Sequence, residues 1–157
     1  MQGNPEFMRR AIALATENVS SGRGGPFGAV IVRDGKVVAT GVNLVTVSND
    51  PTAHAEVVAI RKACTELSGF SLEGCQMYTS CEPCPMCLAA IYWSRMDAIF
   101  YGNTAADAAA AGFDDAFLYK ELTKPVGVRR IPTERLLGEE AIENFDAWRN
   151  FASRVHY

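Results

Sequence analysis

Residues 75–87 read CQMYTSCEPCPMC and predict the point at which a strand meets a helix. The run from Cys75 to Ser80 is rich in residues that strands favour, and Pro83-Cys84 gives a suitable start for a helix. Apolar residues then recur at helical spacing: Met86, Leu88, Ala89, Ile91, Tyr92 and Trp93. In α/β proteins ligands bind beyond the carboxyl ends of strands, so this junction is expected to carry a functional site.

The cysteine pair of this stretch has a counterpart earlier in the chain, at residues 52–56, which read TAHAE. His54, Cys84 and Cys87 offer one imidazole and two thiolates, a ligand set that zinc accepts when a fourth position stays open for water. Glu56 follows the histidine by two residues and is placed to move protons for that water. His-x-Glu followed by Pro-Cys-x-x-Cys is the signature of zinc nucleobase deaminases.

The same residues allow a second interpretation, a closed zinc site without catalysis. Cys81 would then be the fourth ligand, and the domain would be a structural zinc module. This interpretation leaves Glu56 beside the metal with no assigned role. On the catalytic interpretation, Cys81 is a small buried hydrophobic residue.

The composition sets the class of protein. A chain of 157 residues with 48% hydrophobic and 21% charged residues is expected to form one soluble domain, 1–157. The net charge of −3 disfavours a nucleic-acid partner, and no apolar run is long enough for a membrane-spanning helix. The five cysteines are odd in number and crowd one region, which favours a metal site in a reducing compartment, the cytoplasm by default.

Local signals predict the remaining elements. Asn4-Pro5 begins a first helix that runs to about Ser20, and Asp34-Gly35 joins two strands as a hairpin. Asp50-Pro51 is expected to begin the helix that carries His54 and Glu56 in its opening turns. Further along we expect a strand at 97–101, a helix at 104–111 ended by Gly112, an edge strand at 126–132 and a last helix at about 138–153.

Beyond the zinc motifs, several segments resemble one family over nearly the full length. The chain resembles the cytidine-deaminase-like superfamily and, within it, the bacterial guanine deaminase family, through residues 24–30, 49–56, 79–87 and 112–115. This resemblance implies a three-layer α/β/α fold with a five-stranded mixed sheet and one Zn²⁺ per chain. It also implies hydrolytic deamination of guanine to xanthine and ammonia in purine catabolism, by a homodimer with exchanged C-terminal segments.

The resemblance also implies roles for individual residues. Glu56 and Asp115 would be catalytic, and the substrate would be bound by Phe27, Asn43, Ala55, Trp93 and, from the partner chain's tail, Tyr157. The residues themselves leave plainer roles open: a turn-capping asparagine for Asn43, and core packing for Phe27 and Trp93.

Other substrates also remain open at this stage. Guanosine or another nucleobase or nucleoside would use the same zinc chemistry, because one or two pocket residues decide whether a ribose fits. A tRNA adenosine deaminase shares the zinc motifs but should carry basic phosphate-binding segments, and this chain is acidic.

Overall fold

A mixed four-stranded sheet lies at the centre of the larger part of the chain. The computed structural model describes residues 2–157. The chain divides into two units, and the first unit ends at Ala116. In the first unit the strands are β1 (Gly28–Arg33), β2 (Lys36–Val42), β3 (Cys75–Cys81) and β4 (Ala98–Asn103). Their order is β2-β1-β3-β4; β1 is antiparallel to β2 and β3, and β3 is parallel to β4.

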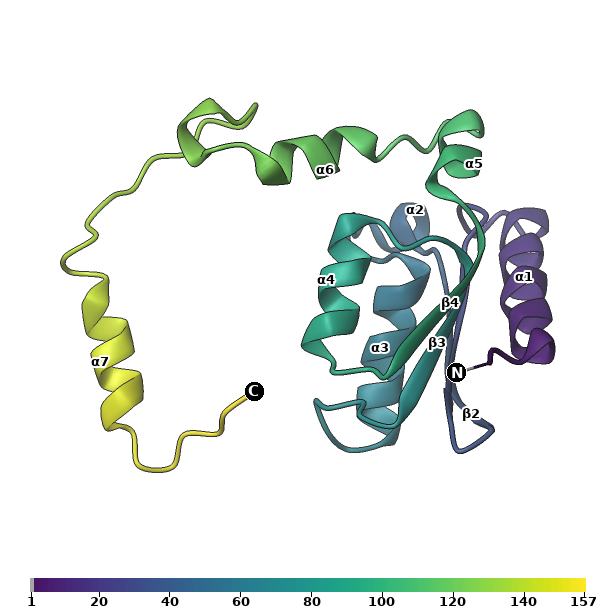
Figure 1. Ribbon diagram of the computed structural model, residues 1–157, viewed down its shortest axis with the longest axis horizontal. Helices are drawn as coiled ribbons and strands as arrows, with labels where there is room; N and C mark the ends of the chain where they lie inside the picture. Colours follow the sequence, from purple (N-terminus) through teal and green to yellow (C-terminus); the bar gives the residue numbers. More distant parts are fainter. Residues whose placement is uncertain (1) are drawn as a thin grey trace. The chain divides into compact units, whose positions relative to one another are not determined.

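Helices cover both faces of this sheet (Figure 1). α1 (Pro5–Ser20) lies on one face, and α3 (Ala55–Glu66) and α4 (Pro85–Trp93) lie on the other. Because side chains alternate along a strand, Val30 and Tyr78 pack toward α1, whereas Ile31 and Met77 pack toward α3 and α4. The predicted three-layer α/β/α fold is therefore confirmed.

The predicted start of α1 and the predicted hairpin both follow from local chemistry. Asn4 is the N-cap of α1, where its side chain accepts a 2.9 Å hydrogen bond from the Glu6 N–H, and Pro5 opens the helix. At the hairpin, Asp34 and Gly35 have φ angles of 50° and 71°, the left-handed conformation that a tight turn between β1 and β2 requires.

Two predicted elements differ in the structure. The sheet of the described residues has four strands rather than five, because residues 126–132 form a 3-10 turn, η1 (Val126–Val128), instead of an edge strand. Pro125 and Pro132 flank this segment and have no N–H for a strand ladder.

The helix that carries Glu56 begins at Ala55 rather than at Pro51. The Asp50 carboxylate accepts from the N–H and the hydroxyl of Thr52, at 2.8 and 2.6 Å, and so forms a turn instead of a helix cap. A short helix that was not predicted, α2 (Val45–Ser48), precedes this turn.

The chain then continues through α5 (Ala105–Ala110), which starts with a capping box between Thr104 and Asp107. Gly112 follows with a φ of 93°, as expected for a residue that ends a helix. The second unit, 117–157, contains most of α6 (Ala116–Thr123), then η1 and α7 (Ile142–Asn150), so the last helix is shorter than predicted. Within residues 2–157, no helix combines the length and the apolar character needed to cross a membrane.

Candidate active site

The three predicted metal ligands meet where two helices begin. His54 is the N-cap of α3, Cys84 is the N-cap of α4, and Cys87 lies in the first turn of α4. The His54 Nδ1 atom lies 3.5 Å from each cysteine Sγ, and the three ligand atoms lie within 4.8 Å of one another. A tetrahedral zinc ion with ordinary Zn–N and Zn–S bonds separates such atoms by about 3.6 Å, so this donor set fits zinc.

Cys81 is close to this cluster but has a different environment. Its Sγ donates to the Thr104 carbonyl oxygen at 3.6 Å, and burial raises the pKa of the thiol to about 11. Among residues 2–157, the group able to hold a metal contains His54, Cys84 and Cys87, without Cys81. Three protein ligands leave a fourth coordination position for a water or a substrate.

The ligand side chains are electrostatically coupled. Hydrogen bonds from Cys87 and His54 lower the pKa of Cys84 to about 4, whereas the bond to Cys84, together with burial, raises the pKa of the Cys87 thiol. The contact with Cys84 also raises the pKa of His54. One thiolate is therefore already favoured in the protein alone, which suits a site that must bind metal through deprotonated sulfur.

Glu56 is the second residue of α3 and follows the ligand His54 by two positions. It is 5% exposed, and burial is the main cause that raises the pKa of its carboxyl group. The Thr79 hydroxyl donates to Glu56 Oε1 at 3.1 Å. A buried carboxyl group with a raised pKa is suited to accept a proton and return it.

A pocket of about 300 Å³ opens over these groups. The predicted site residues that line it are Phe27, Asn43, His54, Glu56, Cys84 and Asp115. Phe113 also lines the pocket, and its ring meets that of Phe27 edge-on, with centroids 5.0 Å apart. The volume is at the small end of the range for ligand pockets, which is roughly 300–1,000 Å³.

Two further polar residues line the pocket. Asn43 follows β2 and is 8% exposed, and its Oδ1 accepts from the Val45 N–H at 3.3 Å. Asparagine 43 therefore caps a turn and lines the pocket at the same time. Asp115 lines the same pocket, and burial and then the charge of Cys84 raise the pKa of its carboxyl group.

The remaining predicted site residues lie elsewhere in the chain. Ala55, the first residue of α3, is fully buried in the core and does not line the pocket. Trp93 is 68% exposed at the last residue of α4 and lines a separate hollow with Tyr92. The length of α4 separates it from Cys84, so this chain by itself does not bring Trp93 to the ligands. Tyr157 belongs to the second unit, and its role in a pocket stays a prediction.

Sequence reasoning missed Thr79 and Phe113. Thr79 shares the sheet face of Met77, and strand alternation from that apolar residue would have placed it against the helix that carries Glu56. Phe113 stands beside Asp115 in the quoted 112–115 segment, but its contact with Phe27 joins residues far apart in the sequence.

Comparison with known proteins identifies the family. The model of the cytidine and deoxycytidylate deaminase zinc-binding region matches residues 1–103. The chain belongs to this deaminase family. It is 58% identical to guanine deaminase from Bacillus subtilis over 96% of this chain and 97% of that protein. The crystal structure of guanine deaminase from B. subtilis matches with a TM-score of 0.96 and 56% identity, over 99% of both chains.

A more distant relative is named for another substrate. The tRNA-specific adenosine deaminase from Aquifex aeolicus is 36% identical over 90% of each chain. The chain described here is thus a zinc-binding deaminase, as the resemblance predicted.

Proposed function

We propose that this deaminase hydrolyses guanine to xanthine and ammonia. The observation that carries the proposal is one pocket, lined by the ligands His54 and Cys84 and by Glu56, Asp115, Asn43 and Phe27. The chain that forms it is similar over 96% of its length to a guanine deaminase. Water supplies the oxygen that replaces the amino group on carbon 2 of the base, and that group leaves as ammonia.

Zinc held by His54, Cys84 and Cys87 would lower the pKa of bound water and so supply a nucleophile at neutral pH. Glu56 would accept the proton that the attacking water loses, because its carboxyl group is buried and borders the same pocket. The carboxyl group then passes the proton to a ring nitrogen. It next takes the proton of the hydroxyl group that has been added to carbon 2 and gives it to the amine, which leaves as ammonia while the carbon–oxygen bond becomes a carbonyl. Thr79 keeps the carboxylate in one orientation throughout.

The other pocket residues bind and orient the base. Phe27, held edge-on by Phe113, offers its ring face for stacking. Asn43 offers an amide that both donates to and accepts from a purine edge. Asp115 has a raised pKa and lines the same pocket, which supports a role in holding or protonating the leaving amine.

An ammonia-release assay tests this assignment. Purified protein with its zinc content measured is mixed in turn with guanine, guanosine, cytosine and an adenosine-bearing tRNA. Release from guanine with xanthine as the product is expected. Release from guanosine or from the tRNA alone would replace guanine by that substrate, and zinc-loaded protein without any release would favour the structural zinc module.

We also propose that the 117–157 segment exchanges between two copies of the chain and that Tyr157 closes the partner's pocket. Neither α6 nor α7 buries a side chain within this unit. Large apolar residues that are more than half exposed occur along this segment: Leu122, Val128, Ile131, Leu136, Leu137, Phe145, Phe151, Val155 and Tyr157. So much exposed apolar surface is typical of a segment that packs on another chain.

Light scattering at several protein concentrations tests the exchanged dimer. We expect a dimer, and we expect Tyr157→Ala to raise the KM for guanine while the dimer persists. A stable monomer with full activity would contradict the exchange.

The five free cysteines further support work in a reducing compartment such as the cytoplasm. Cell fractionation that recovers the protein outside the cytoplasm would contradict this location.

A further inference from the structure

One buried amide joins the two segments that carry the proposed base-binding residues. Asn18 is fully buried in the last turn of α1. Its Nδ2 donates to two main-chain carbonyl oxygens, that of Gly25 at 2.9 Å and that of Asn43 at 2.8 Å. Both protons of the Asn18 amide group are thus used, each on a different segment.

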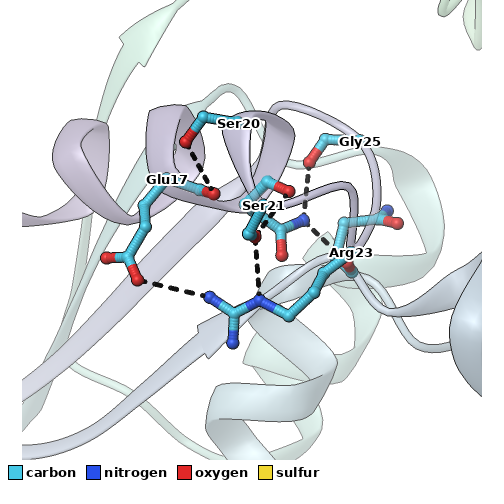
Figure 2. Close-up of polar contacts among 7 residues, drawn as sticks. Glu17, Ser20, Ser21, Arg23 and Gly25 are labelled. Carbon is cyan, nitrogen blue, oxygen red and sulfur yellow. Dashed lines mark hydrogen bonds and ion pairs between the residues drawn. The ribbon is translucent and has the colours of Figure 1, made fainter.

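The turn after α1 is built around the same residue. The Asn18 carbonyl oxygen accepts from the Arg23 N–H at 3.1 Å and from the Ser21 hydroxyl at 3.2 Å. The Arg23 side chain folds back as well: its Nε donates to the Ser21 hydroxyl at 3.0 Å, and its guanidinium pairs with Glu17 at 3.5 Å (Figure 2). The main chain and the side chain of Asn18 therefore fix both ends of this turn.

The turn lies tightly against the end of β2. A Cβ atom at Gly24 would overlap the Asn43 carbonyl oxygen and would lie 3.2 Å from Asn18 Nδ2. On its other side, Asn43 donates its N–H to the Phe27 carbonyl oxygen at 3.1 Å. Asn43 is thus held by its carbonyl group toward α1 and by its N–H group toward Phe27, which leaves its backbone little freedom.

We infer that Asn18 is a positioning residue that fixes Asn43 against the turn of Phe27, so that both face the base in the pocket. This inference rests on the proposed function of Asn43 and Phe27. Asn18 does not line the pocket, and its effect is transmitted through the Asn43 main chain. A leucine would fill a similar volume but would donate to neither carbonyl group.

The kinetics of Asn18→Leu give the first test. If Asn43 contacts the base equally in the ground state and the transition state, its displacement raises KM and spares kcat. We expect the KM for guanine to rise roughly tenfold, the scale of one lost hydrogen bond, while kcat and zinc content stay near those of the unmutated protein. Ser94→Ala is the matched control, because it removes a buried 2.9 Å hydrogen bond, to Ile91, at the other end of α4 from the ligands. Its KM should not change.

Gly24→Ala perturbs the same contact without removing Asn18. We expect it to raise KM in the same way, so the test survives even if Asn18→Leu fails to fold. Gly69→Ala serves as its control, because a Cβ atom there would meet only the Leu67 carbonyl oxygen, at 3.8 Å. An unchanged KM in both Asn18→Leu and Gly24→Ala would overturn the inference.

A double-mutant cycle separates positioning from stability. Asn43→Ala removes the base-contacting amide but keeps the carbonyl group that Asn18 holds. In that background, Asn18→Leu should still lower the melting temperature. It should raise KM by less than about twofold, which is the usual deviation from additivity between two mutations. A full rise in KM would show that Asn18 does not act through Asn43.

Hydrogen exchange gives a readout without turnover. The main-chain N–H of Asn43 should exchange several-fold faster in Asn18→Leu than in Ser94→Ala. Equal exchange rates would contradict the inference. If the unmutated chain does not deaminate guanine, the proposed function fails. The positioning role is then still read from this exchange rate and from the KM for whichever base of the panel is deaminated.

Discussion

The Thr79 hydroxyl donates a 3.1 Å hydrogen bond to the Glu56 carboxylate, and this bond links β3 to the first turn of α3, next to the ligand His54. Both side chains are buried, with exposed fractions of 1% and 5%. Burial raises the pKa of Glu56, and the bond from Thr79 opposes that rise. The strand thus sets both the orientation and the basicity of the proposed proton carrier.

Thr79→Val should shift the pH profile of the enzyme toward higher pH. Valine keeps the shape and removes the donor, so the pKa of Glu56 rises further. The carboxylate then takes a proton at a higher pH, and the acid limb of kcat/KM moves upward in pH. At neutral pH we expect a loss of about tenfold in kcat/KM.

Thr65→Val is the control for this substitution. The Thr65 hydroxyl donates to the Arg61 carbonyl oxygen on the exposed side of α3. Its pH profile should match that of the unmutated protein. A Thr79→Val profile that keeps its acid limb would show that the hydroxyl does not tune Glu56.

Glu56→Gln should abolish turnover and leave the metal in place. The amide keeps the size of the side chain but carries no proton between water and base, so a kcat loss of about 10²- to 10⁴-fold is expected. Zinc analysis and ammonia release measure the two effects separately. Glu66→Gln, at the exposed end of the same helix, should change neither. Full turnover by Glu56→Gln would remove this residue from the mechanism.

Alanine at the cysteines should distinguish an open zinc site from a closed one. Cys84→Ala removes a ligand, so zinc content and turnover should both fall steeply. Cys81→Ala removes only a thiol that donates to the Thr104 carbonyl oxygen, so zinc should stay near one per chain. Loss of zinc from Cys81→Ala would show a four-ligand structural site.

Gly41→Ala should destabilise the first unit by packing. A Cβ atom there would overlap the Ala55 carbonyl oxygen and lie 2.6 Å from the Ala59 nitrogen, so β2 and α3 must separate. Overpacking of this kind costs about 1–3 kcal/mol in the free energy of unfolding. Urea unfolding measures the loss, with Gly69→Ala as the unaffected comparison. Equal stability of the two variants would mean that the strand and helix have room to move.

Part of this protein could be predicted from short stretches of sequence. The start of α1 at Asn4-Pro5 and the turn at Asp34-Gly35 depend on the local preferences of a few adjacent residues. The zinc motifs also identified the family, because a metal restricts which side chains can bind it and how they are spaced. The edge strand expected at 126–132 did not form, since a strand depends on a partner that local sequence does not specify.

The sequence by itself determined the family and the side chains able to bind the metal, and it predicted the carboxyl group that we propose as the proton carrier. Only the tertiary structure decided the neighbours of these groups. Thr79 reaches Glu56, and Asn18 reaches Asn43, across 23 and 25 positions of sequence. Such contacts depend on sheet register and on the packing of helices against the sheet. Both are settled by burial over the whole chain, because a one-residue change in register turns every side chain of a strand to the other face.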